Sequence, residues 1–129
     1  MALHRHEVEA FLDAYAKSLT AGDMHALAAA WHTPSLVIAH DGRSVVVASA
    51  EQVAQLFRSA SEQYRNARIS LVERHESHIE MISEHRAHAT VTWALSTADG
   101  HAAGQEKGFY VVSETGRRGH IAIDFFAPG

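Results

Sequence analysis

The stretch VEAFLDAYAKSLTAGDMHALAAAW, residues 8–31, decides the fold. Its first part carries apolar side chains at the spacing of one helical stripe: Val8, Phe11, Leu12, Tyr15, Ala16 and Leu19. Gly22 can end this helix at little conformational cost, and Asp23 can cap a second helix that carries its own apolar stripe as far as Trp31. Two helices joined by so short a break must turn their apolar faces toward a shared partner. The phenol of Tyr15 is the polar group on the first stripe, so we expect it to point into that partner.

The apolar patterns after residue 31 predict what these two helices pack against: a curved sheet and one more helix. Asp41-Gly42 is a hairpin signal between two short apolar strands. Ser49 and Gln52 have the spacing of a capping box and open a third amphipathic helix. After this helix the apolar pattern changes to period two, which is typical of strands. We expect the strands at residues 36–39, 45–47, 69–82, 87–97, 105–114 and 119–126.

Helices segregated beside an antiparallel sheet define the α+β class. We therefore predict a cone-shaped, curved antiparallel sheet of about six strands, packed against three helices from the N-terminal half and enclosing an apolar pocket. The length of 129 residues favours a single domain over residues 1–129.

Composition excludes several classes of function. The net charge is −4, and the longest basic run is Arg117-Arg118, so we expect neither a nucleic-acid nor a membrane partner. The sequence has no cysteine, which excludes disulfides and thiol chemistry. No segment has the length and apolarity of a signal peptide or a membrane span, so we expect a cytoplasmic protein.

Several local strings resemble the nuclear transport factor 2-like superfamily. They are Tyr15 followed by Ala21-Gly22-Asp23, the helix end at residues 27–31, residues 49–57 and the closing strand at 121–126. That superfamily includes ketosteroid isomerase, the SnoaL-like polyketide cyclases, scytalone dehydratase and limonene epoxide hydrolase. The resemblance implies a cone with a ligand pocket. It does not imply one activity, because this fold hosts unrelated functions.

The ketosteroid isomerase pattern can be tested residue by residue. In that family a tyrosine and a protonated acid form the oxyanion hole, and an aspartate moves the proton. Tyr15 matches the tyrosine, but the position of the proton-moving aspartate falls on Ala39, and the second acid falls near Lys107. Because only one of the three groups is matched, we exclude steroid isomerisation by that mechanism.

The same alignment implies a pocket that is mostly apolar and aromatic. Its expected lining is Tyr15, Ala39, Leu56, Val91, Trp93, Lys107, Phe109, Asp124 and Phe126. Asp124 stands in an otherwise apolar strand, where an unpaired carboxylate is costly and acquires the raised pKa of a general acid or base. Two alternatives are open: an ion pair with Lys107, or a register shift that turns Asp124 outward.

We predict Tyr15 as hydrogen-bond donor to a developing oxyanion, Asp124 as general acid or base, and His32 or His40 as its proton partner. Both histidines flank the first predicted strand, and imidazole moves protons near neutral pH. In the alternative interpretation Tyr15 and Trp93 only fill the core.

The motifs His75-x-x-His78 and His85-x-x-His88 suggest zinc, but three-residue spacing on a strand sends the two rings to opposite faces. With His88 opposite Ile79 and His75 opposite Thr92, no two rings meet, so we predict no metal and no cofactor. We expect these residues on the outer sheet face, which in this superfamily often forms a homodimer interface. The polar set there is His75, Ser77, His88, Thr90 and Thr92.

Together, pocket and resemblance predict a protein that binds a small hydrophobic molecule, with the acid–base chemistry of a cofactor-free isomerase, cyclase or dehydratase. The alternatives are a non-catalytic ligand-binding or dimerisation module and, if the histidines converge in space, a metal-dependent hydrolase or oxygenase.

Overall fold

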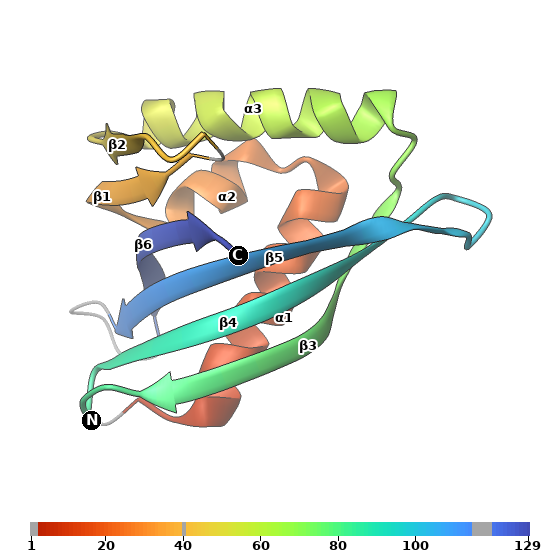
Figure 1. Cartoon of the computed structure of the whole chain (residues 1–129). Helices are drawn as coiled ribbons and strands as arrows, with labels where there is room; N and C mark the ends of the chain where they lie inside the picture. Colours follow the sequence, from red (N-terminus) through yellow and green to blue (C-terminus); the bar gives the residue numbers. More distant parts are fainter. Residues whose placement is uncertain (1–2, 40, 115–119) are drawn as a thin grey trace.

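The computed structural model describes residues 3–39, 41–114 and 120–129. In it, three helices lie on one side of a strongly curved sheet, with α1 behind the long strands and α3 across the end formed by β1 and β2 (Figure 1). The elements are α1 (Arg5–Ala21), α2 (Met24–Ala29), β1 (Trp31–Ile38), β2 (Ser44–Val47), α3 (Ala50–Asn66), β3 (Leu71–Met81), β4 (Arg86–Ser96), β5 (Ala102–Glu114) and β6 (Ile121–Pro128). No helix in the described ranges is long and apolar enough to cross a membrane.

The end of α1 and the starts of α2 and α3 form as the sequence predicts, but α2 ends at Ala29, and Trp31 begins β1 instead of closing the helix. Gly22 adopts the left-handed conformation, with φ of 67°, and ends α1. Asp23 caps α2 by accepting a hydrogen bond from the backbone N–H of Ala26. Ser49 caps α3 by accepting from the backbone N–H of Gln52, whose side chain accepts in return from the N–H of Ala48. The short break at Gly22-Asp23 thus turns α2 away from α1.

The six strands form one sheet in the order β2-β1-β6-β5-β4-β3. The α+β class and the strand number agree with the prediction, but the sheet is mixed, because β1 and β6 pair in parallel. The other neighbours are antiparallel. This parallel pair joins the N-terminal hairpin to the last strand, so the chain ends beside its own first strand.

Strand alternation gives the sheet an inner face toward the helices and an outer face away from them. On β4 the inner side chains are buried, as predicted: Ala87, Ala89, Val91, Trp93 and Leu95. The predicted register between β3 and β4 is wrong by one residue, since His88 pairs with Glu80. A β-bulge between Arg74 and Glu76 then takes His75 out of register, which the alternation pattern alone does not reveal.

Candidate functional site

A cavity of about 360 Å³ lies between the inner face of the sheet and the helices α1 and α3. All three tyrosines and both tryptophans of the sequence line it. The full lining is Tyr15, Leu19, Trp31, Val37, Ile38, Ala39, Val45, Leu56, Phe57, Ser59, Ala60, Gln63, Tyr64, Trp93, Glu106, Lys107, Tyr110 and Phe126. Such a volume is at the lower end of the range for small-molecule sites, roughly 300–1,000 Å³.

The strands place the polar and aromatic groups by simple alternation. Trp93 on β4 pairs with Glu106 on β5, so both side chains share the inner face, and Tyr110 lies four residues further along that face. Gly108 stands between them. A Cβ there would come within 2.8 Å of the Phe126 ring and 2.9 Å of the Tyr110 ring. The missing side chain therefore leaves the space that the Phe126 ring occupies.

Five rings form a closed circuit around the cavity. The centroid of Tyr15 lies 6.0 Å from that of Phe57, which lies 6.1 Å from Trp31. The ring centroid of Trp31 lies 6.5 Å from that of Phe126, and the Phe126 centroid lies 5.1 Å from that of Tyr110. The Tyr110 centroid lies 6.1 Å from that of Tyr15 and closes the circuit. These separations are those of contacting aromatic pairs. The lining is thus a continuous aromatic wall drawn from α1, α3, β1, β5 and β6.

Burial keeps the cavity phenols protonated. It raises the pKa of Tyr15 well above its usual value, and the neighbouring phenols act in the same direction. Burial also raises the pKa of Tyr64, and the negative charge of Glu106 and a hydrogen bond to its carboxylate raise that pKa further. Tyr110, whose oxygen accepts a hydrogen bond from Trp93 Nε1 at 3.0 Å, has a raised pKa for the same main reason. At neutral pH all three tyrosines are therefore neutral groups that can donate hydrogen bonds.

Six predicted pocket residues do line the cavity: Tyr15, Ala39, Leu56, Trp93, Lys107 and Phe126. Val91 and Phe109 do not. Val91 has an exposed fraction of 0% because it is packed in the core. Phe109 lies on the outer face, since it alternates with Tyr110, and its ring contacts those of His88 and Phe125.

Asp124 is also outside the cavity, which corrects the prediction that it faces Tyr15. The cause is a β-bulge in β6: Ile123 pairs with Val112 and Phe125 with Val111, which leaves Asp124 without a partner residue on β5. The bulge turns the carboxylate to the outer face. Of the two alternatives left open, the ion pair with Lys107 does not occur among the ion pairs of the described residues, and the outward orientation is the one found.

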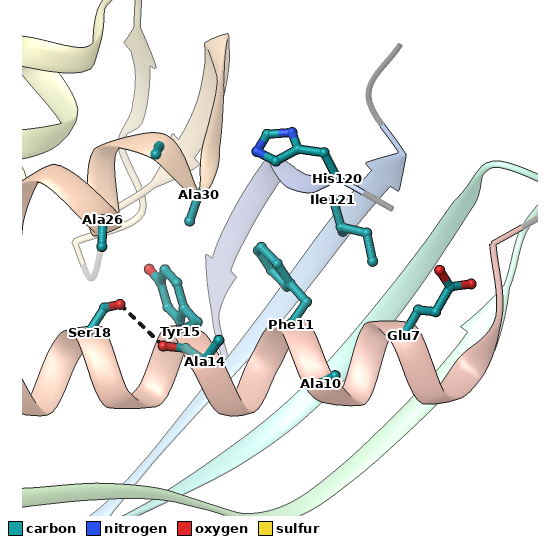
Figure 2. A pocket seen from close by; sticks show the side chains of 11 residues that line it. Glu7, Ala10, Phe11, Ala14, Tyr15, Ser18, Ala26, Ala30, His120 and Ile121 are labelled. Atoms are coloured by element: carbon teal, nitrogen blue, oxygen red, sulfur yellow. Dashed lines mark hydrogen bonds between the residues drawn. The ribbon is translucent and has the colours of Figure 1, made fainter. Parts of the chain in front are cut away.

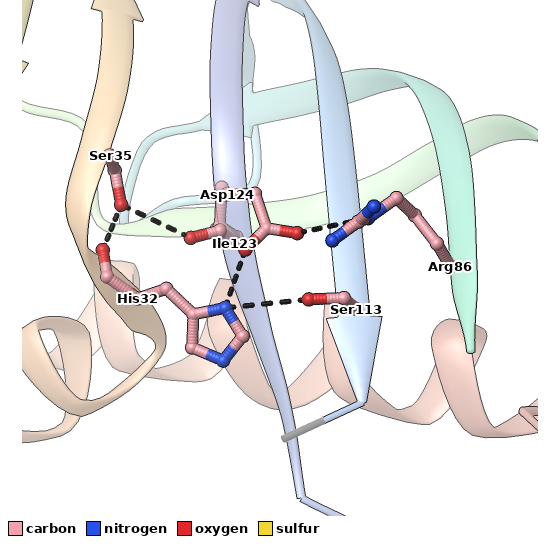
Figure 3. A network of polar contacts seen from close by, with 6 residues as sticks. All are labelled: His32, Ser35, Arg86, Ser113, Ile123 and Asp124. Carbon is pink, nitrogen blue, oxygen red and sulfur yellow. Dashed lines mark hydrogen bonds and ion pairs between the residues drawn. The ribbon is translucent and has the colours of Figure 1, made fainter. Parts of the chain in front are cut away.

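On the outer face a network of polar contacts around Asp124 joins four strands, with β5 reached through His32 (Figure 3). Its Oδ1 lies 2.5 Å from His32 Nδ1, and its Oδ2 lies 3.5 Å from Arg86 Nε. Ser113 Oγ lies 3.4 Å from the same His32 nitrogen. The structure thus brings together the predicted pair His32 and Asp124, but separates it from Tyr15. His40 lies outside the described residues.

The sequence analysis missed Glu106, the carboxylate of the cavity. The resemblance placed an acid position near Lys107, and strand alternation from Tyr110 assigns Glu106 rather than Lys107 to the inner face. The resemblance implied an inward Phe109 instead, and Phe109 lies on the outer face, so the inward position of Tyr110 comes from the structure. No group of three His, Cys, Asp or Glu residues able to hold a metal ion occurs among residues 3–39, 41–114 and 120–129.

A groove of about 530 Å³ lies between α1, α2 and the start of β6 (Figure 2). Phe11 and Tyr15 line it from α1, and His120 and Ile121 from the other side. Much of the remaining wall consists of alanines, namely Ala10, Ala14, Ala26, Ala29 and Ala30. Tyr15 borders both this groove and the cavity. Small alanine side chains supply much of the groove wall, whereas large aromatic side chains line the cavity, so the cavity is the stronger candidate site.

A mixed sheet curved around an aromatic cavity and closed by three helices defines a protein of the cystatin-like, NTF2-like α+β class. The chain belongs to the NTF2-like protein family designated DUF6841, whose sequence profile matches residues 6–123. This confirms the superfamily that the sequence resembles.

Solved structures show the same fold at low sequence identity. A protein of unknown function with a cystatin-like fold from Nostoc punctiforme is 12% identical, with a TM-score of 0.76 over 99% of this chain and 93% of that one. A putative calcium/calmodulin dependent protein kinase II association domain from Xanthomonas campestris is 18% identical, with a TM-score of 0.70 over 98% and 86%. An NTF2-like protein of unknown function from Shewanella oneidensis is 12% identical, with a TM-score of 0.70 over 95% and 96%. No functionally curated protein matches the chain.

Proposed function

We propose that this protein binds a small hydrophobic molecule in the cavity between the sheet and the helices α1 and α3. The observation that carries the proposal is the concentration of every tyrosine and tryptophan of the sequence around one cavity. Aromatic side chains supply large apolar contact areas, and their polar ends orient a ligand by hydrogen bonds. Tyr15 is suited to donate a hydrogen bond to a ligand oxygen, because its phenol stays protonated.

Binding can be tested with 2-tetralone, a bicyclic ketone of suitable size. Because both tryptophans line the cavity, a bound ligand should change their fluorescence and also raise the melting temperature by mass action. Ala60→Phe should abolish both effects by filling the cavity from α3, where Ala60 lines it. Arg58→Phe is the matched control, because it adds the same ring at an exposed position of α3 that does not line the cavity. Equal binding by the wild type and Ala60→Phe would refute the proposed location.

A second candidate function is cofactor-free proton transfer, as in an isomerase, cyclase or dehydratase. It is favoured by the contact of 2.5 Å between His32 Nδ1 and Asp124 Oδ1. A carboxylate that accepts the proton of Nδ1 leaves Nε2 as a base. The substrate of this pair would bind at the outer face, and Tyr15 would take no part.

Deuterium exchange tests this second candidate without a known substrate. The wild type should exchange the α-protons of small ketones in D₂O faster than buffer does, as followed by NMR. His32→Gln should remove the acceleration, whereas His75→Gln, at an exposed position of β3, should keep it. An identical rate for the wild type and His32→Gln would refute the role of this pair.

We also propose that two copies pair through the outer sheet face. Support comes from the half-buried rings of Phe109 and Phe125, whose centroids lie 6.2 Å apart on that face beside His88. Light scattering on the purified chain should give the mass of a dimer, and Phe109→Lys should give that of a monomer. A wild-type monomer at micromolar concentration would contradict the pairing.

A further inference from the structure

The cavity contains a carboxylate that no cation neutralises within the described part of the chain. Glu106 takes part in none of the ion pairs there. Lys107 is its neighbour and also borders the cavity, but alternation places the Lys107 side chain on the face of Thr92, its partner on β4. Lys107 is exposed, and the ion pairs of the described residues include none between it and Glu106. Tyr64 has a hydrogen bond to this carboxylate, but a neutral phenol supplies no positive charge. A carboxylate at the wall of an apolar cavity is costly unless a partner compensates its charge.

Glu106 shares the cavity wall with aromatic residues. Glu106 and Tyr110 lie on the same face of β5, separated on that face by Gly108 alone, and the charge of Glu106 contributes to the raised pKa of Tyr64 and Tyr110. Trp93 lies directly across from Glu106 in the β4–β5 pair, and its ring centroid is 6.3 Å from that of Tyr110. The negative faces of aromatic rings attract a cation within about 6 Å of the ring centroid, and tryptophan does so most strongly.

An organic ammonium ion is recognised by two features together: a carboxylate that has no other counter-ion, and aromatic rings whose faces attract a cation. We propose that the cavity selects a small amine-bearing hydrophobic molecule, with its ammonium group between Glu106 and the rings of Trp93 and Tyr110. The inference rests on the proposed binding function and adds the charge of the ligand. The cavity of about 360 Å³ restricts the ligand to one or two rings or a group of that size.

Charge preference can be measured with three probes of similar shape: phenyltrimethylammonium, its uncharged carbon isostere tert-butylbenzene, and the anion benzenesulfonate. Tryptophan fluorescence reports binding, since Trp31 and Trp93 both line the cavity. The wild type should bind the cation about tenfold tighter than the neutral isostere, and the anion weakest. This ranking is obtained without any variant, so it does not depend on a substitution that folds poorly.

Glu106→Gln should bring the cation and the isostere to about equal affinity, within roughly twofold, chiefly by weakening the binding of the cation. Glu62→Gln is the matched control, because it removes the same charge from an exposed position of α3 outside the cavity lining and should preserve the tenfold preference.

Two results overturn the inference, with different consequences for the proposed function. If the wild type binds tert-butylbenzene as tightly as the cation, or if Glu106→Gln keeps the preference, the ligand is not selected by charge, and binding of hydrophobic molecules still stands. If none of the probes and no neutral aromatic ligand binds the folded protein, both the inference and the proposed function fail.

Discussion

Gly108→Ala provides the sharpest test of how the cavity is built. The backbone of Gly108 lies outside the positive-φ region, so alanine brings no backbone strain there. Its Cβ, however, would lie 2.8 Å from Phe126 Cε2 and 2.9 Å from Tyr110 Cε2, closer than side-chain atoms approach. Overpacking of this kind costs about 1–3 kcal/mol, whereas replacing glycine gains about 0.4–1 kcal/mol by restricting the unfolded chain. We therefore expect a net loss of about 1–2 kcal/mol in the free energy of unfolding.

Thermal and urea unfolding followed by circular dichroism measure this loss. For a domain of this size the melting temperature should fall by roughly 3–5 °C per kcal/mol, which is about 3–10 °C in all. The same change displaces the Phe126 ring from the cavity wall, so ligand binding should weaken together with stability.

A double-mutant cycle supplies the control. In a Phe126→Leu background the closest ring atom is gone, so Gly108→Ala should cost less than in the wild type, with a coupling of at least about 0.5 kcal/mol. A Gly108→Ala variant as stable as the wild type, or additive effects in the cycle, would refute the assigned contact between Gly108 and the Phe126 ring.

Three further predictions concern other parts of the molecule. Tyr110→Phe leaves the buried Nε1–H of Trp93 without its acceptor and should cost about 1–3 kcal/mol in urea unfolding; no loss would show that this hydrogen bond is not formed. The hydrogen bond from Arg74 lowers the pKa of Asp13, so Asp13 contributes stability above its unfolded pKa of about 3.9 that is lost as the pH falls through its lower folded value. Asp13→Asn should therefore flatten the fall in melting temperature below about pH 4, by a small amount because the Asp13 side chain is about half exposed, and an unchanged acid profile would contradict this. Asp124→Asn should lower stability through its outer-face contacts and leave ligand affinity in the cavity unchanged; a loss of affinity in a variant that folds would contradict its position on the outer face.

The sequence predicted the parts of the fold that local chemistry determines. The helix stripe from Val8, the left-handed Gly22 and the Ser49 cap depend on residues within a few positions of one another, and all three form as expected. The parallel pairing of β1 with β6 could not be predicted in this way. It joins residues about 90 positions apart, and neither strand carries a local signal for its neighbour's direction.

Which residues of the candidate site can be predicted depends on the same difference between local and long-range information. Asp124 was assigned to the cavity from the family resemblance, which carries no information on the bulge in this β6 that turns the residue to the outer face. Glu106 lies on a stretch of β5 that pairs regularly with β4 from Gly104 to Ser113, so counting from Tyr110 gives its face correctly. Alternation is therefore reliable only between bulges, and nothing in a single sequence marks where a bulge falls. Asp124 is conspicuous in the sequence because it interrupts an apolar strand, yet its carboxylate lies outside the cavity. Glu106, which stands in a polar stretch beside Lys107, supplies the carboxylate that lines it.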